Sequence, residues 1–286
     1  MSNPMPKTLE KVEKILLALD GSDSSSGALK ASIYLSQLFN SKLYVISVAV
    51  EPKLEEILDV YPLEAAERVE HKVLEYLESI KKKLEEERIV CETIFRRGPE
   101  PYKYIIEEAL KNDVNLIIMG RRGKTRFMKA LMGSVTARTI GEAFCPVLVI
   151  PKDSELHLNK ILLATDGSIY SMFAAYEAIN LLKYSKGELT ILSVAKREEN
   201  MPAAEESVRI AKEVSERQGI KAETMVLIGE PFEVIVKTAK EKEAGLIVMG
   251  CYGKTGIEKL LMGSVTERVI GFTNKPVLVV RRLKKD

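Results

Sequence analysis

Residues 120–140 read GRRGKTRFMKALMGSVTARTI, directly after the apolar run LIIM. Residues 250–270 read GCYGKTGIEKLLMGSVTERVI after LIVM, and 13 of these 21 positions agree between the two stretches. A second match lies upstream of each: residues 14–22 read KILLALDGS and residues 160–168 read KILLATDGS, which agree at eight of nine positions. The chain is therefore two copies of one domain in tandem.

The offsets between the copies locate their boundaries and their difference. The upstream motifs are 146 residues apart and the glycine-rich stretches 130, so the second copy is 16 residues shorter. Nearly all of that difference lies between Glu51 and Lys83. We expect domains at residues 9–152 and 158–283, joined by the polar stretch PKDSELHL at 151–158. We expect the extra segment, Glu51 to Pro62, to be a solvated surface excursion; the alternative is a lid over a site.

Composition bounds the class of protein. The 286 residues are 46% apolar and 29% charged, which is typical of globular chains. The net charge is only +2 and there is no Trp, so neither a phosphate-tracking surface nor base-stacking platforms are expected. No apolar run approaches the roughly 18 residues that a membrane span needs. Met1 to Lys14 lacks the apolar core of a secretory signal, and we expect a short mobile lead-in there.

Three cysteines, Cys91, Cys145 and Cys251, lie far apart and form no C-x-x-C pair. An odd, sparse set fits a reducing cytoplasm, and we expect buried small hydrophobes. The two histidines, His71 and His157, are expected at the surface. Neither belongs to a cluster with the spacing of a zinc site or to a recognisable catalytic triad, so no catalytic or metal-ligating residue is predicted.

Strand-like and helix-like stretches alternate along each copy. The first copy predicts strands at 15–19, 43–50, 89–95, 116–119 and 146–150. It predicts helices near 28–38 and at 63–84, 104–110 and 135–144. Near-continuous apolar strands alternating with helices indicate a parallel sheet covered on both faces, and right-handed crossovers make it doubly wound.

The glycine pattern is the strongest candidate for site chemistry. The order is Gly120-x2-Gly123-x9-Gly133-Ser134, repeated from Gly250 to Ser264. Glycines let backbone N–H groups approach a phosphate, and the helix start after Gly133 collects unpaired N–H groups and partial positive charge. The alternative is that the glycines are only turn residues and Ser134 only caps the helix, although Ser134 could instead donate its hydroxyl to a phosphate.

Asp20 and Asp166 end the first strand of each copy, where doubly wound sheets hold ligands, and a carboxylate there can accept from ribose hydroxyls. The alternative is an Asp-Gly turn residue. The serines at 22 and 24–26 are interpreted as the cap of the following helix.

A P-loop is excluded by spacing. It needs a glycine at the positions that Ile118 and Val248 occupy. Lys124 and Lys254 are expected to be solvated; the alternative is that they approach phosphates.

Taken together, these motifs resemble the universal stress protein family over nearly the whole chain. Its ATP-binding members carry G-x2-G-x9-G-[ST] after the fourth strand, and LLALDGS and LLATDGS are similar to its opening motif. The resemblance implies two doubly wound five-stranded parallel sheets of order 3-2-1-4-5, adenine nucleotide alpha-hydrolase-like, in tandem. It implies adenine nucleotide (ATP, ADP or AMP) as ligand, with Mg²⁺ possible alongside ATP.

By the same resemblance, Asp20 and Asp166 would bond the ribose, Val48 and Val194 would meet the adenine through their backbone, and the glycine–serine stretches would hold phosphates. The expected site residues of the first copy are Ala18, Leu19, Asp20, Val48, Met119, Gly120, Arg122, Gly123, Gly133, Ser134 and Val135. Those of the second copy are Ala164, Thr165, Asp166, Val194, Met249, Gly250, Gly253, Gly263, Ser264 and Val265.

The copies differ between their first two glycines, where Arg121-Arg122 stands against Cys251-Tyr252. The sites are therefore expected to differ in affinity or in preferred phosphate number, because Arg122 could pair with a phosphate and Tyr252 carries no charge.

The family also pairs fifth strands, and a bare apolar edge invites pairing. We predict antiparallel contact between Val147–Val149 and Val277–Val279 within one chain, with a homodimer of such chains as a further expectation.

Three functions remain open from the sequence. The first is a nucleotide-binding sensor or regulator in a stress response, with a protein partner that the sequence does not identify. The second is a slow ATPase or nucleotidyl transferase. The third is a scaffold whose sites are vestigial.

Overall fold

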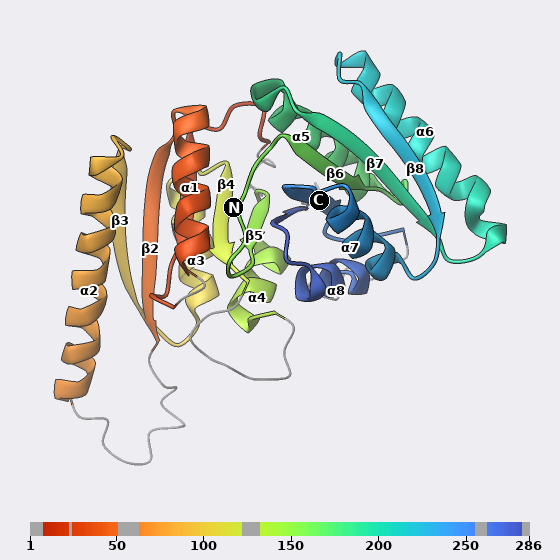
Figure 1. Cartoon of the computed structure of the whole chain (residues 1–286). Coiled ribbons are helices and arrows are strands. Elements are labelled where there is room, and N and C mark those ends of the chain that lie inside the picture. The colour runs from red at the N-terminus through yellow and green to blue at the C-terminus, as the bar shows by residue number, and fades with distance from the viewer. Residues whose placement is uncertain (1–7, 23–24, 51–62, 122–131, 255–261, 282–286) are drawn as a thin grey trace, which may run out of the picture.

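The computed structural model describes residues 8–22, 25–50, 63–121, 132–254 and 262–281 (Figure 1). The elements of the first half, in chain order, are β1 Lys14–Ala18, α1 Ser25–Phe39, β2 Lys42–Val50, α2 Leu63–Glu86, β3 Cys91–Gly98, α3 Pro101–Lys111, β4 Leu116–Gly120, α4 Ser134–Glu142 and β5 Val147–Ile150. Those of the second half are β6 Lys160–Ala164, α5 Ile169–Ser185, β7 Glu188–Ala195, the 3-10 turn Glu198–Asn200, α6 Met201–Arg217, β8 Ala222–Ile228, α7 Pro231–Glu241, β9 Leu246–Gly250, α8 Ser264–Phe272 and β10 Val277–Val280.

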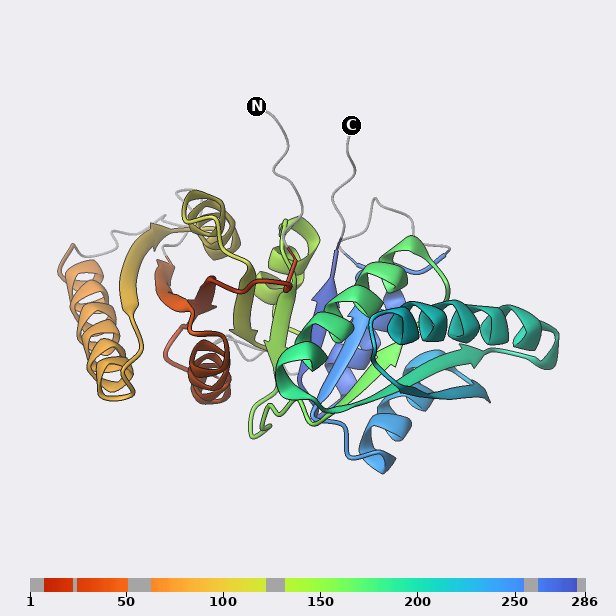
Figure 2. The ribbon, with the colours of Figure 1, turned by 90° about the horizontal axis from the view of Figure 1, so that it is seen from above.

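All ten strands form one sheet in the order β3-β2-β1-β4-β5-β10-β9-β6-β7-β8. Each half is parallel and has the expected order 3-2-1-4-5. The halves join through β5 and β10, which run antiparallel with Leu148 opposite Leu278 and with Val147–Val149 paired to Val277–Val279. The predicted edge pairing is therefore confirmed, and the halves lie side by side along this seam (Figure 2).

The strands bury both of their faces, as their near-continuous apolar runs predict. Along β1, Ile15 and Leu17 face one core while Leu16 faces the other. Helices α1, α2, α5 and α6 contribute to the first core, and α3, α4, α7 and α8 to the second. Each core contains residues of both halves, so the seam lies within continuous apolar packing. Among the described helices, none is long and apolar enough to cross a membrane.

The segment before β1 is docked on the second half, so the expectation of a mobile lead-in is wrong for residues 8–13. Leu9 and Val12 are buried in the core that α5 shares. The Leu9 N–H donates to Glu177 Oε2 at 2.7 Å, and the Tyr184 hydroxyl donates to the Glu10 carbonyl at 2.8 Å. Two apolar side chains and two hydrogen bonds therefore hold this segment on α5.

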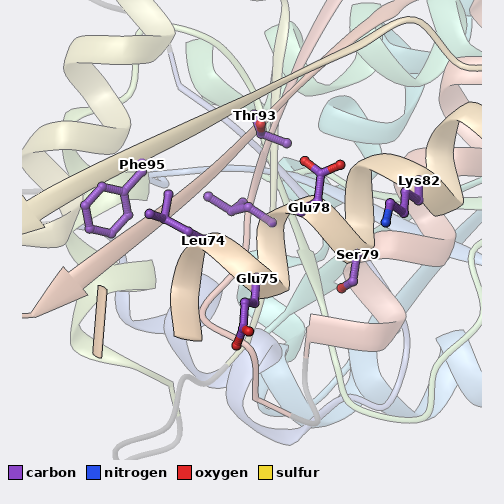
Figure 3. Close-up of a pocket in the computed structure, with 8 residues that line it drawn as sticks. Leu74, Glu75, Glu78, Ser79, Lys82, Thr93 and Phe95 are labelled. Atoms are coloured by element: carbon purple, nitrogen blue, oxygen red, sulfur yellow. The ribbon is translucent and has the colours of Figure 1, made fainter. Parts of the chain in front are cut away.

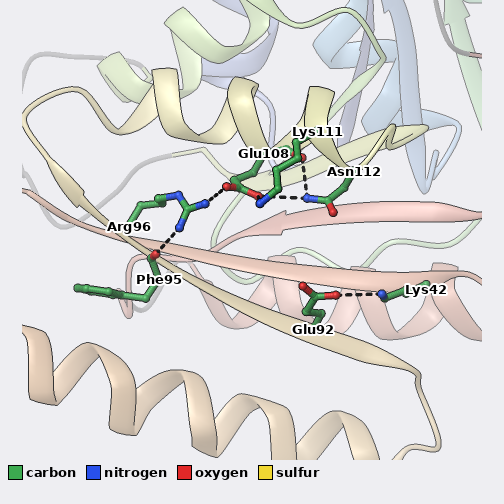
Figure 4. Close-up of polar contacts among 7 residues, drawn as sticks. All are labelled: Lys42, Glu92, Phe95, Arg96, Glu108, Lys111 and Asn112. Carbon is green, nitrogen blue, oxygen red and sulfur yellow. Dashed lines mark hydrogen bonds and ion pairs between the residues drawn. The ribbon is translucent and has the colours of Figure 1, made fainter.

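Charged side chains connect β3, the outermost strand of the first half, to its neighbours β2 and α3 (Figure 4). Lys42 of β2 pairs with Glu92 of β3 at 3.0 Å. Arg96 of β3 pairs with Glu108 of α3, a carboxylate that is almost fully buried and also accepts from Asn112 at 3.2 Å. The burial of Glu108 is tolerable because these partners offset its loss of water.

Histidine and cysteine environments agree in part with expectation. His71 is exposed as expected. His157 is half-buried, and a Cβ on Gly245 would stand 2.2 Å from its Nδ1, so the expectation of a surface position is wrong for His157. The linker that carries His157 packs closely against the Gly245 turn before β9. Cys145 and Cys251 are buried as expected, whereas Cys91 is only partly so.

Candidate functional site

The expected site residues gather at the carboxyl edge of each half-sheet. Ala18 at the end of β1 lies in register with Met119 of β4, and Ala164 lies in register with Met249. The order 3-2-1-4-5 places the reversal of strand order between these two strands, because the connection after β1 leads to β2 on one side and that after β4 leads to β5 on the other. Open α/β sheets hold ligands at that reversal.

A small apolar surface lines this edge in each half. Ala18, Val48 and Val135 come from β1, β2 and α4, and all three are partly exposed while packing on the same core. In the second half Val194 and Val265 are likewise partly exposed, next to the buried Ala164. A planar apolar group could rest on such a surface with one side still facing solvent.

Leu19 and Thr165 follow these strands and act through their backbone. The Leu19 N–H donates to the Ile46 carbonyl and the Thr165 N–H donates to the Leu192 carbonyl, both at 2.9 Å. These bonds extend the pairing between the first two strands of each half by one residue. They fix the start of the Asp20 and Asp166 turns.

Helices α4 and α8 begin at this edge without a side-chain cap. Gly133 and Gly263 occupy the cap positions in extended conformation, and neither can supply a capping oxygen. Ser134 and Ser264 are the first helical residues and are exposed. The alternative in which Ser134 caps the helix is therefore wrong. No described residue accepts from the first-turn N–H groups of α4 or α8, which are therefore available to solvent or to an anion.

The helix starts are fixed to the ends of their strands. The Gly133 N–H donates to the Arg121 carbonyl at 3.0 Å, and the Gly263 N–H donates to the Cys251 carbonyl at 2.9 Å. Thr136 Oγ1 donates to the Gly120 carbonyl at 3.1 Å, as Thr266 Oγ1 does to Gly250 at 2.9 Å. The threonines were absent from the predicted site, although the repeated GSVT stretch contains them.

The glycines divide into two kinds. A Cβ on Gly250 would stand 2.8 Å from the Tyr170 backbone, and one on Gly253 would stand 2.7 Å from Asp166 Oδ2. Backbone crowding requires glycine at position 250, whereas a side chain at position 253 would have to displace the Asp166 carboxylate. Gly263 has φ −70, and among the described residues its Cβ would meet nothing closer than 3.4 Å, so neither strain nor crowding by the described residues requires glycine there.

Both aspartates take part in turn and loop contacts. Asp20 Oδ1 accepts from the Ser22 N–H at 3.0 Å and the Ser25 hydroxyl at 2.9 Å. Asp166 Oδ1 accepts from the Ser168 N–H at 3.0 Å, and its Oδ2 from the Lys254 N–H at 2.8 Å. In the second half these bonds use two of about four acceptor positions of the carboxylate. The interpretation of the serine run as a cap region holds in part, because α1 starts at Ser25.

Residues of α2 and α6 approach these turns, which sequence reasoning missed because the spacing along the chain does not show it. Burial raises the pKa of Tyr76 and the charge of Asp20 raises it further, while a hydrogen bond with Ser25 lowers it. In the second half Ser207 Oγ would stand 2.6 Å from a Cβ on Gly167. Each aspartate turn therefore has a hydroxyl-bearing neighbour from the second helix of its half.

Some expectations fall outside the described residues: Arg122, Gly123, Lys124, Ser24 and the segment Glu51 to Pro62. Lys254 is described and is exposed, as expected for a solvated lysine. Within the described ranges, no group of three or more His, Cys, Asp or Glu side chains is arranged to hold a metal ion.

A separate hollow of about 620 Å³ lies between α2 and β3, away from the strand-order reversal (Figure 3). It shares no residue with the predicted site. Its lining residues are Leu74, Glu75, Leu77, Glu78, Ser79, Lys82, Thr93 and Phe95.

The fold and the edge geometry define a doubly wound α/β protein with uncapped helix starts at its strand-order reversal. A family model described as the universal stress protein family matches residues 11–151 and 157–281. The chain therefore belongs to the universal stress protein family, as a tandem of two such regions.

Relatives and solved structures agree with this assignment. A universal stress protein of Methanocaldococcus jannaschii is 37% identical over 157 residues, covering 48% of this chain and 90% of its own length. One of a Synechocystis species is 27% identical over 297 residues, covering 94% of this chain and 100% of its own length. The crystal structure of a universal stress protein from Archaeoglobus fulgidus has a TM-score of 0.79 at 26% identity, covering 97% and 99% of the two chains.

Proposed function

We propose that each half binds one adenine nucleotide at its carboxyl edge, and that the occupied protein acts as a sensor or regulator in a stress response. In the first half the base rests on Ala18 and against the Val48 backbone, and Asp20 accepts from the ribose. The phosphates meet the first turn of α4, from Gly133 to Val135. The second half repeats this with Ala164, Val194, Asp166 and the start of α8.

The observation that carries the proposal is the pair of glycine caps. In both halves a helix starts at the ligand-binding edge with no side-chain cap and with an exposed serine first. Natural helices usually satisfy these N–H groups with Ser, Thr, Asp or Asn at the cap, and glycine leaves them to an outside acceptor. The apolar residues beside each start suit a purine, and the resemblance to ATP-binding family members points to the same ligand.

The test replaces each cap glycine by aspartate, whose carboxylate can accept from the first N–H groups of the helix. Gly133→Asp and Gly263→Asp supply a good helix cap, so the melting temperature should hold or rise, while the new charge takes the N–H groups and repels phosphate. Titration calorimetry of the wild type with ATP, ADP and AMP should give two sites. Each single variant should lose one site, with affinity there falling at least tenfold, and the double variant should lose both.

Gly133→Ser and Gly263→Ser are the matched controls, because serine caps the helix without a charge and should weaken binding less. No heat from the wild type with any of the three nucleotides would defeat the proposal and leave a scaffold. Titrations with and without Mg²⁺ would show whether the ion accompanies ATP. A turnover well above about 1 per second, the low end for typical enzymes, would replace the sensor with an enzyme.

A further inference from the structure

Arg121 of the first half reaches the second half. It follows Gly120 directly at the end of β4, and its Nη1 donates to three carbonyl oxygens at the end of α8. The distances are 3.2 Å to Ile270, 3.2 Å to Gly271 and 2.7 Å to Thr273. The last carbonyls of a helix have no partner within it and carry partial negative charge, so one guanidinium here satisfies and neutralises the end of α8.

The other end of the same helix is the proposed phosphate end of the second site. Helix α8 runs from Ser264 to Phe272, about 13 Å at 1.5 Å per residue. Because β5 and β10 run antiparallel, the carboxyl edges of the two half-sheets lie on opposite sides of the joined sheet. Helix α8 therefore spans from the second site, at Gly263, to the edge of the first site, at Arg121.

The backbone of Arg121 belongs to the first site. Its carbonyl accepts the Gly133 N–H at 3.0 Å, and its own N–H donates to the Ile150 carbonyl at 2.9 Å. A continuous set of contacts thus runs from the cap of α4, through the backbone and side chain of Arg121, along α8 to its cap at Gly263. The matching position in the second half is Cys251, whose buried thiol is neutral and cannot play the part of a guanidinium.

Resting on the proposed function, we propose that Arg121 is a positioning residue for the second nucleotide site and couples the two sites. Its charge holds α8 in place and cancels the negative pole of that helix, which leaves the positive pole at Gly263 to act on phosphate. The ligand of the first site contacts the α4 cap, and this cap is bonded to Arg121. Binding at the first site therefore changes how firmly Arg121 holds α8. By linkage, ligand at the second site then changes affinity at the first by the same factor.

The test measures the second site alone, in full-length Gly133→Asp protein whose first site is closed. Adding Arg121→Met should weaken ATP binding at the second site three- to tenfold, with the circular dichroism spectrum unchanged. Arg121→Lys keeps the charge and three donors on a flexible stem and should retain most of the affinity. Cys251→Ala in Gly263→Asp protein is the mirror control, and binding at the first site should change less than twofold.

The coupling is measured in protein with both sites open. Wild-type titrations should require two interacting sites, and Arg121→Met should make the sites independent. Absence of any binding to the wild type would overturn the proposed function and this inference together. Two binding sites whose affinities stay within twofold in Arg121→Met would overturn this inference alone. If Arg121→Met does not fold, equal and independent sites in the wild type would overturn it as well.

Discussion

Glu177 sits between α5 and the docked N-terminal segment, with 3% of its surface exposed. Burial raises the pKa of its carboxyl most strongly, and the nearby Glu10 carboxylate also raises it, while the hydrogen bonds from the Leu9 N–H and Asn180 lower it. Together these effects leave the pKa at about 7. The carboxylate therefore takes up a proton near neutral pH, at the contact between the start of the chain and its second half.

The sign of the resulting pH dependence follows from the two states. In the unfolded chain the pKa of Glu177 is 4.5, so between pH 4.5 and about 7 the folded protein holds a proton that the unfolded chain has released. The stability contributed by this group is complete below pH 4.5 and is lost as the pH rises through 7. A shift of this size corresponds to roughly 3 kcal/mol.

Glu177→Gln should remove this dependence, because the amide oxygen still accepts from Leu9 and carries no charge. From pH 5 to 8 the unfolding free energy of the wild type should fall by about 3 kcal/mol relative to the variant, measured by urea denaturation. Glu205→Gln, at an exposed position of α6, is the control and should track the wild type. Parallel pH profiles for wild type and Glu177→Gln would contradict the assignment.

At the scale of elements, the two halves carry different residues at one pair of matching positions. Arg96 of β3 forms an ion pair with Glu108 of α3. The matching residues of the second half are Leu227 of β8 and Thr238 of α7. The strand register shows the match, because Val48 pairs with Arg96 and the equivalent Val194 pairs with Leu227. Thr238 is buried like Glu108. At these positions the second half thus has uncharged residues in place of a half-exposed arginine and a buried glutamate.

This repeat makes a matched exchange possible. Arg96→Leu leaves the Glu108 carboxylate buried without its main partner and should destabilise the protein by about 3 kcal/mol. The double exchange Arg96→Leu with Glu108→Thr copies the second half and should return to within about 1 kcal/mol of the wild type. Chemical denaturation of the wild type, Arg96→Leu, Glu108→Thr and the double variant checks this. If the losses of stability in the two single variants simply add in the double variant, the two side chains do not act as a pair.

Elements were predictable from the sequence because their signals are local. The apolar steps through Val73, Leu77 and Ile80 predicted a helix at 63–84, and α2 runs from Leu63 to Glu86. The helix expected at 104–110 starts earlier, at Pro101, because proline suits the first helical turn and the apolar stripe alone does not mark it. Local patterns predicted that the strands exist and the family resemblance implied their order, whereas element ends shifted by up to a few residues.

The pairing of the two edge strands was predicted, but side-chain contacts between distant segments were not predictable. The Leu9 N–H donates to Glu177, which is 168 residues away, and Arg121 donates to carbonyls about 150 residues away. A side chain's reach across the seam depends on the joined sheet, and no spacing in the sequence encodes it. Within the candidate site, the gathering at the strand ends was predictable. The difference between Gly250, crowded by backbone, and Gly263, whose Cβ would meet no described atom closer than 3.4 Å, needed coordinates.

For the whole molecule, the shared cores imply one cooperative unit. Leu148 and Leu278 face each other across the seam and belong to a core that both halves supply. Calorimetry of the wild type should therefore show a single unfolding transition. Leu148→Ala should shift that transition down as a whole, by about 3 kcal/mol or roughly 5 °C. Two resolved transitions in the wild type would show that the halves unfold separately.

The antiparallel seam also inverts one half of the molecule relative to the other. The entrances proposed for the two ligands consequently open in opposite directions. A partner protein bound over one entrance would leave the other entrance open, so one ligand could exchange while the other stays covered. A binding partner that recognises only the form with both ligands bound would have to reach both entrances, either by wrapping around the molecule or by binding as a dimer.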